Sequence, residues 1–237
     1  FVSRRTSEVI KYAANAFLAT KITFINEMAD LCEKVGANVQ DVSRGIGLDG
    51  RIGSKFLHAG PGYGGSCFPK DTLALMKTAQ DHEAPLQIVE AVVRVNDLRK
   101  RAMARKVIAA MGGDVEGKRI AMLGLTFKPN TDDMRDAPAI VIAQGLIDAG
   151  AEVIAYDPEG MEAAAALMPG VTMAEGAYQA LQDADCAVIV TEWDVFRALA
   201  LPRVLATMRG NTLVDLRNIY KPEQMKAAGF HYVSVGR

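Results

Sequence analysis

The residue of this chain best placed to do chemistry is a cysteine in a glycine-rich turn. Cys67 stands in the stretch Gly64–Asp71, three residues before Lys70 and four before Asp71. A buried structural cysteine needs none of these neighbours. A nucleophilic cysteine needs space for a substrate, positive charge that favours the thiolate, and a group that handles water or protons. The spacing therefore indicates a catalytic thiol, and the helix expected after it would direct its positive end toward a thiolate or an anion.

A second pair of polar residues lies on the first predicted helix. Lys11 and Asn15 are spaced i, i+4 and so share a helix face, where together they could hold a developing oxyanion. The alternative is an exposed lysine beside a polar residue on a solvated face, which the base rate for charged residues favours when the pair is taken alone. Tyr12 and Phe17 argue against that alternative, because they leave little of the helix solvated there.

Further cations follow strands of a predicted sheet. Lys128 and Arg135 come after the first strand, and Arg217 comes after a later one. Ligands of open α/β sheets bind beyond the carboxyl ends of the strands, so these cations could meet phosphates; the alternative is a charged surface loop. Gly124 is not followed by the other glycines of a G-x-G-x-x-G turn, so the usual pyrophosphate fingerprint is missing. Arg51 is a loop cation for which no local acid partner is expected.

The bulk properties exclude several classes of protein. With 27 basic and 28 acidic residues among 237, the chain has no net field that would attract nucleic acid or a membrane surface. No apolar run approaches the roughly 20 residues of a membrane span, and no signal peptide is visible. Cys32 and Cys186 fit buried positions, and no disulfide framework is expected, which indicates a reducing, cytoplasmic location. No metal-ligand spacing is present, and Trp193 is interpreted as packing at a strand end.

Hydrophobic periodicity predicts an α/β protein of two parts. Residues 1–113 are expected to form an all-helical central domain that carries the cysteine loop and a long connecting helix, with helices at 6–35, 39–45, 71–82 and 85–111. Residues 117–237 are expected to form a Rossmann-like, doubly wound parallel sheet, with strands at 119–124, 153–157, 186–190, 212–215 and 232–235 and helices at 138–149, 161–168 and 176–181. Ile88, Val92, Val95 and Leu98 are expected to form the apolar face of the long helix, a candidate dimer contact.

Four motifs in one order resemble the UDP-glucose/GDP-mannose dehydrogenase family over nearly the whole chain. Glu8–Phe17 resembles its central helix and Arg51–Leu57 its substrate loop. Gly62–Asp71 resembles its nucleophile loop, and Leu125–Lys128 with Arg135 resembles the start of its nucleotide-sugar domain. The resemblance implies an enzyme that uses NAD to oxidise UDP-glucose to UDP-glucuronate. It also implies that this enzyme is a homodimer, formed through the helical domain.

The resemblance also implies catalytic roles. Cys67 would attack the aldehyde at C6 of the sugar and hold a thiohemiacetal and then a thioester. Lys11 and Asn15 would stabilise oxyanions and position the substrate, and Asp71 would help to activate the hydrolytic water. Lys70 and Arg135 would contact NAD.

The remaining implied residues bind the substrate. Arg51 would reach the substrate of the neighbouring subunit, which requires a dimer. His58 stands where some members of the family have a lysine, so its contact differs from theirs. The others would wrap or anchor the UDP-sugar: Phe56, Leu57, Ala59, Gly60, Gly64, Phe127, Lys128 and Arg217.

Other interpretations remain open at this point. GDP-mannose or UDP-N-acetyl-hexosamine dehydrogenases would share the architecture and the mechanism. A non-catalytic module that binds a nucleotide sugar and dimerises is a second alternative, and an ordinary thiol hydrolase lacks a plausible histidine near Cys67. The chain starts at Phe1 without a methionine, and the NAD-binding domain of the family has no counterpart in it. We therefore interpret it as part of a longer enzyme and expect the isolated segment to be inactive.

Overall fold

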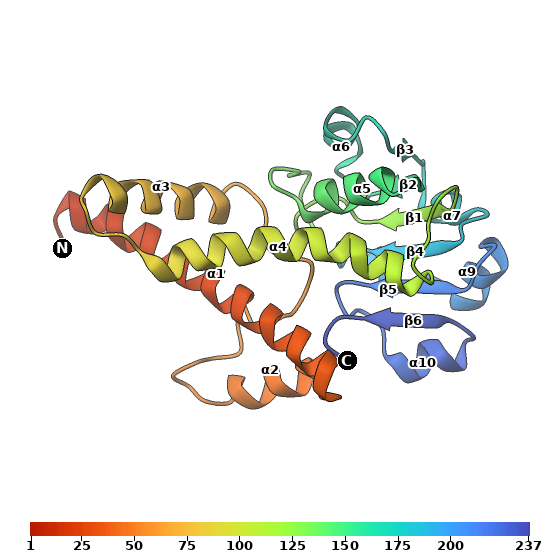
Figure 1. Cartoon of the computed structure of the whole chain (residues 1–237), viewed down its shortest axis with the longest axis horizontal. Helices are drawn as coiled ribbons and strands as arrows, with labels where there is room; N and C mark the ends of the chain where they lie inside the picture. Colours follow the sequence, from red (N-terminus) through yellow and green to blue (C-terminus); the bar gives the residue numbers. More distant parts are fainter. The chain divides into compact units, whose positions relative to one another are not determined.

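The computed structural model describes residues 1–237, which form two compact units (Figure 1). One unit contains Phe1–Arg99 together with Gly236–Arg237 and is helical, and the other contains Lys100–Val235 and is α/β. The predicted fold class is confirmed. The two units divide between Arg99 and Lys100, inside a long helix, whereas the domain boundary predicted from the sequence lies after residue 113. That domain boundary stays a prediction.

The helices of the first unit follow the predicted periodicity closely. They are α1 (Arg4–Val35), α2 (Val39–Gly47), α3 (Phe68–Asp81) and α4 (Gln87–Ala110), and α4 continues into the second unit. Ser3 caps α1 by accepting a hydrogen bond from the backbone N–H of Thr6, and Gly36 ends it in the left-handed region at φ 72°. None of these helices combines the length and apolar character that a membrane span requires.

Helix α3 begins three residues earlier than predicted, at Phe68 instead of Asp71. Pro69 lies in its first turn, where a proline costs no intrahelical hydrogen bond and already has a helical φ. The earlier start makes Cys67 the N-cap residue and places Asp71 in the first turn of the helix.

The predicted apolar face of α4 is only partly buried. Val92 is buried, but Ile88 and Leu98 are exposed. The buried positions beside Val92 are taken by Asn96 and Arg99. Helix α4 therefore turns polar side chains toward the interior, where they bind loop backbone, as described below.

The last two residues of the chain pack on the helices of the first unit. The Gly236 carbonyl accepts a hydrogen bond of 2.8 Å from the Val39 N–H, the first of α2. The Gly236 N–H donates to Glu33 Oε1 of α1 at 2.7 Å. A Cβ on Gly236 would lie 2.5 Å from a methyl carbon of Val39, so only glycine fits here. The chain thus crosses between the units twice, within α4 and after Val235.

The second unit is a six-stranded parallel sheet with strand order β3-β2-β1-β4-β5-β6. This is the doubly wound order, whose direction reverses between β1 and β4. The strands are β1 (Arg119–Leu123), β2 (Glu152–Tyr156), β3 (Thr172–Met173), β4 (Cys186–Ile189), β5 (Thr212–Asp215) and β6 (His231–Ser234). The helices between them are α5 (Pro138–Asp148), α6 (Met161–Leu167), α7 (Ala177–Leu181), α8 (Asp194–Arg197), α9 (Leu201–Thr207) and α10 (Pro222–Ala227). The sequence analysis did not predict β3, α8, α9 or α10.

Two turns meet closely where the strand order reverses. Gly124 follows β1 with φ at 90°, and a Cβ built on it would lie 2.5 Å from the backbone nitrogen of Thr191, which follows β4. A side chain at Gly124 would therefore be strained and would also collide with backbone. This glycine allows the loops after β1 and β4 to approach each other.

We expect Gly124→Ala to destabilise the chain by about 2–5 kcal/mol, because left-handed strain adds to the collision with Thr191. Gly117→Ala is the matched control, since Gly117 has φ at 66° but nothing within 4 Å of its added Cβ. Its cost is strain alone, about 1–2 kcal/mol. Urea unfolding of both variants measures the difference. Equal losses would show that the close approach of the two turns contributes nothing.

Candidate functional site

A buried carboxylate collects the polar residues of α1 and α3. Asp71 is 3% exposed, and its Oδ2 accepts a hydrogen bond of 2.5 Å from Nδ2 of Asn15. The ammonium of Lys11 lies 3.5 Å from the same oxygen, and that of Lys70 lies 3.7 Å from Oδ1. Lys11 and Asn15 therefore share one face of α1, as their spacing predicts, and that face meets the first turn of α3.

Cys67 is accessible at the start of α3. Its side chain is exposed and makes no capping hydrogen bond, and its carbonyl accepts from the Asp71 N–H at 2.9 Å. The unpaired N–H groups and positive dipole of the helix start lie beside it. Cys32 and Cys186 are buried, as expected, and burial raises the pKa of the Cys186 thiol to about 12. Cys67 alone among the three has the access that a nucleophile needs.

The loop that leads to Cys67 carries the predicted substrate-binding residues 56–60 and 64. Leu57, Ala59, Gly60 and Gly64 are buried, whereas Phe56 and His58 are exposed. Phe56 has φ at 65°, an uncommon conformation for a residue with a side chain, and strain of this kind concentrates at ligand sites. Its ring packs against that of Phe68 at 6.1 Å between centroids.

Three buried polar side chains, which sequence reasoning missed, hold the backbone of this loop. Asn26 Oδ1 accepts from the Gly60 N–H at 2.8 Å, and Arg99 Nε donates to the Gly60 carbonyl at 2.9 Å. Asn96 accepts from the Tyr63 N–H at 2.9 Å and donates to its carbonyl at 3.1 Å. Polar residues on the same helix face as Val92 were the available signal.

The expectation that Arg51 lacks a local acid partner is wrong. Its guanidinium donates to both carboxylate oxygens of Asp49, at 3.0 Å from Nε and 2.6 Å from Nη2. These bonds lower the pKa of Asp49, because they favour its charged form. The pair is solvent-exposed, so Arg51 could exchange Asp49 for another anion at little cost.

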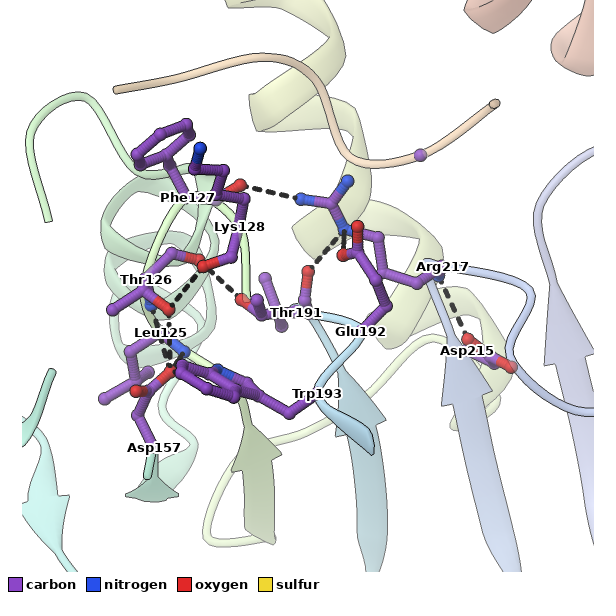
Figure 2. A network of polar contacts seen from close by, with 12 residues as sticks. Leu125, Thr126, Phe127, Lys128, Asp157, Thr191, Glu192, Trp193, Asp215 and Arg217 are labelled. Atoms are coloured by element: carbon purple, nitrogen blue, oxygen red, sulfur yellow. Dashed lines mark hydrogen bonds and ion pairs between the residues drawn. The ribbon is translucent and has the colours of Figure 1, made fainter. Parts of the chain in front are cut away.

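In the second unit, loops from several strands converge at the carboxyl edge of the sheet (Figure 2). Arg217, after β5, donates from Nε to the Val190 carbonyl at 2.8 Å and from Nη2 to the Phe127 carbonyl at 3.2 Å. Its Nε also lies 3.1 Å from Oε2 of Glu192, although no hydrogen bond forms there. Phe127, Lys128 and Arg217 are thus brought together, with the exposed Lys128 amine 5.4 Å from the centre of the Phe127 ring.

Arg135 lies further along the same loop and has an acid partner. It donates from Nε to Asp133 Oδ1 at 2.9 Å and from Nη2 to Oδ2 at 2.8 Å. This side-chain pairing is the main reason that the pKa of Asp133 lies below its usual value. The pair leaves the guanidinium of Arg135 largely exposed.

Two family models match the chain. The central domain of the UDP-glucose/GDP-mannose dehydrogenase family matches residues 5–98, and the UDP binding domain of the same family matches residues 121–222. A UDP-glucose 6-dehydrogenase of Rhizobium meliloti is 69% identical over all of this chain and 54% of its own length. A UDP-glucose 6-dehydrogenase of Bacillus subtilis is 47% identical over 98% of this chain and 50% of its own length.

Solved structures agree with these matches. A UDP-glucose dehydrogenase from Pyrobaculum islandicum superposes with a TM-score of 0.87 at 36% identity, over 99% of this chain and 52% of that one. An NDP-N-acetyl-D-galactosaminuronic acid dehydrogenase from Methanosarcina mazei superposes with a TM-score of 0.86 at 27% identity, over 99% and 51%. The chain spans about half the length of the curated relatives it matches.

We expect a thiol reagent to label the native chain at Cys67 only. Cys32 and Cys186 are 4% and 0% exposed, so they react only after an opening that costs several kcal/mol, which slows labelling by about 10³-fold or more. Mass spectrometry of peptides after brief alkylation identifies the labelled site, and Cys67→Ser should abolish the fast phase. Fast labelling of either buried cysteine, or none of Cys67, would contradict this assignment.

Proposed function

The chain belongs to the UDP-glucose/GDP-mannose dehydrogenase family, and from that premise we propose that the full-length protein containing it oxidises UDP-glucose to UDP-glucuronate with NAD. The observation that carries the proposal is an accessible thiol at Cys67 beside the buried carboxylate of Asp71, to which Lys11 and Asn15 bind. These four residues supply a nucleophile, an oxyanion site and a base in one place.

Cys67 retains the substrate between two oxidations. Transfer of a hydride from C6 to NAD, with loss of the hydroxyl proton, would convert the alcohol to an aldehyde. The thiolate would add to that carbon, and uptake of a proton by the resulting oxyanion would give a thiohemiacetal. Loss of a second hydride gives a thioester, and water then releases the carboxylate and regenerates the thiolate. An unattached aldehyde could leave after the first step, which explains the need for a covalent link.

The cluster around Asp71 divides the remaining tasks. The ammonium of Lys11 and the amide of Asn15 contact Asp71, which lies one helical turn after Cys67, and would stabilise the negative oxygen of the two tetrahedral species. Oδ2 of Asp71 accepts the hydrogen bond from Asn15, whereas Oδ1 has the ammonium of Lys70 at 3.7 Å as its recorded contact. Oδ1 can therefore accept a proton from the water that hydrolyses the thioester.

Each unit carries residues of its own that would bind the substrate. In the first, the backbone of residues 56–60 with Gly64 would enclose the sugar, and its rigid support by Asn26, Asn96 and Arg99 fits that task. In the second, Phe127, Lys128 and Arg217 would hold the UDP group at the carboxyl edge of the sheet.

The sheet of the second unit does not fit a dinucleotide. The turn after β1 lacks the G-x-G-x-x-G pattern, and the acid at the end of β2, Asp157, is buried and already bound by protein donors. NAD, which accepts the hydrides, would therefore be bound mainly outside residues 1–237, with Lys70 and Arg135 as contacts. We expect the 237-residue segment alone not to reduce NAD. Its free cysteines suit a reducing compartment such as the cytoplasm.

An apolar groove on the first unit favours a homodimer. It is lined mainly by Ala13, Ala16, Phe17, Leu75, Leu86 and Ile88, and Phe17 and Ile88 are 65% and 70% exposed. Large exposed apolar side chains gathered in one place are typical of association surfaces, and a two-fold axis would let the same groove meet itself. The exposed Arg51 could then reach the neighbouring subunit.

We expect Cys67→Ala to lower kcat of the full-length protein by at least about 10³-fold, because the two buried cysteines of this chain cannot retain the aldehyde in its place. Lys11→Ala should cost about 10²–10³-fold and Asp71→Asn about 10²–10⁴-fold. Cys32→Ala is the matched control and should stay within about twofold of wild type. NADH formation from UDP-glucose, two per product, is the measurement.

The same assay separates the alternatives. A kcat/KM for UDP-glucose at least about tenfold above those for GDP-mannose and UDP-N-acetyl-hexosamines supports the proposed substrate. Unchanged function after Cys67→Ala would favour a non-catalytic module that binds a nucleotide sugar.

We expect Ile88→Glu to convert the full-length dimer to monomer, because a charge would be buried in an apolar interface. Leu167→Glu is the control, since Leu167 is also an exposed apolar residue but lies on α6 of the other unit. Sedimentation velocity measures both. A wild-type monomer, or a dimer unaffected by Ile88→Glu, would remove this groove as the interface.

A further inference from the structure

Asp157 is the most heavily bonded side chain at the carboxyl edge of the sheet, and it is fully buried (Figure 2). It follows β2 directly. Its Oδ2 accepts from the backbone N–H groups of Leu125 and Thr126, at 2.7 and 3.1 Å. The Thr126 hydroxyl lies 3.1 Å from this oxygen and 3.1 Å from the Lys128 carbonyl, and its one proton is shared between them. Oδ2 of Asp157 also accepts from the indole N–H of Trp193 at 3.1 Å.

The other carboxylate oxygen closes the local turn. Oδ1 accepts from the N–H groups of Glu159 and Gly160, at 3.0 and 2.8 Å. A Cβ on Gly160 would lie 2.5 Å from the side-chain methyl of Thr126, so the turn after β2 packs directly against the loop after β1. A buried carboxylate is expensive to desolvate, and donors on both oxygens offset that cost.

The acid occupies the place that dinucleotide-binding sheets use for ribose recognition. In those sheets an acidic residue after β2 presents its carboxylate to the ribose hydroxyls. Here the carboxylate of Asp157 turns inward and spends its acceptor capacity on protein donors. Asp157 can therefore influence a ligand only indirectly, by holding the loop after β1.

That loop is held on three sides. Asp157 binds the N–H groups of Leu125 and Thr126. Thr191, after β4, donates to the Thr126 carbonyl at 2.5 Å, and Arg217, after β5, donates to the Phe127 carbonyl. Asp157 binds the N–H groups at the start of the loop, and it also links the loop to Trp193 of the neighbouring turn.

We propose that Asp157 is a positioning residue that fixes the loop 125–128 in the conformation that binds the nucleoside diphosphate of the substrate. The inference rests on the proposed function, because it assigns the loop to the UDP group. An amide cannot replace the carboxylate, since its NH₂ would face N–H or O–H donors whichever way it turned. A second consequence is spectroscopic. Trp193 is the single tryptophan of this chain and is bonded to Asp157, so its emission reports the state of the loop.

The test uses the full-length protein with Asp157→Asn and a matched control. Asp185 also lies at an end of a strand, accepts from the Arg119 N–H at 2.8 Å and binds Arg209, but it precedes β4 at the opposite edge of the sheet. Asp185→Asn therefore removes comparable bonds away from the loop. The measurements are KM and kcat for UDP-glucose, the Kd of UDP by calorimetry, and tryptophan emission on addition of UDP.

We expect Asp157→Asn to raise KM and the Kd of UDP by about tenfold or more, with kcat within about threefold of wild type. Asp185→Asn should lower Tm but keep KM within about twofold. Comparison with Trp193→Phe identifies the part of the UDP-induced emission change that comes from Trp193. That part should be absent in Asp157→Asn. A merely structural role would lower Tm for both variants without separating KM from kcat.

Milder variants keep the test decisive if Asp157→Asn does not fold. Trp193→Phe removes one donor to Asp157. Thr126→Val removes a hydroxyl shared between Asp157 and the Lys128 carbonyl. Each variant should raise the Kd of UDP by about two- to fivefold. A wild-type Kd in both would overturn the positioning role and leave the proposed function intact. Absence of UDP binding by the unchanged protein would overturn the proposed function, and this inference with it.

Discussion

Each unit of this protein contains a buried, desolvated carboxylate that is bound by several polar groups. Removing a charged oxygen from solvent costs several kcal/mol unless donors converge on it, so the residues around it are constrained in type and direction. Asp71, in the first turn of α3, is bound by a donor from α1. Asp157 is bound by donors from the turns after β1, β2 and β4. Many features of the candidate site follow from these two requirements.

The two carboxylates differ in what their partners leave free. Asp157 has neutral donors on both oxygens, so it holds structure and has no capacity left for a ligand. Asp71 has one neutral donor and two ammonium groups at longer range. That arrangement keeps charge and proton capacity beside an accessible thiol. The same residue type thus serves rigidity in one unit and is proposed to serve chemistry in the other.

Local spacing predicted the long helices, most strands, the shared face of Lys11 and Asn15 and the accessibility of Cys67, because each depends on a few neighbouring residues. The hydrogen bonds from Asn26, Asn96 and Arg99 to the loop backbone could not be predicted, because they join residues more than 30 positions apart. Asp157 was missed for the same reason: its partners come from distant turns. The Arg51–Asp49 pair is local and was overlooked, since a two-residue spacing pairs side chains in a turn but not in a helix.

The placement of Gly236 has a consequence for dissecting the molecule. Because its carbonyl satisfies the first N–H of α2, a segment truncated after residue 99 would lack a native partner from the opposite terminus. The helical unit is therefore discontinuous in sequence, and no single continuous segment could carry it intact into another protein.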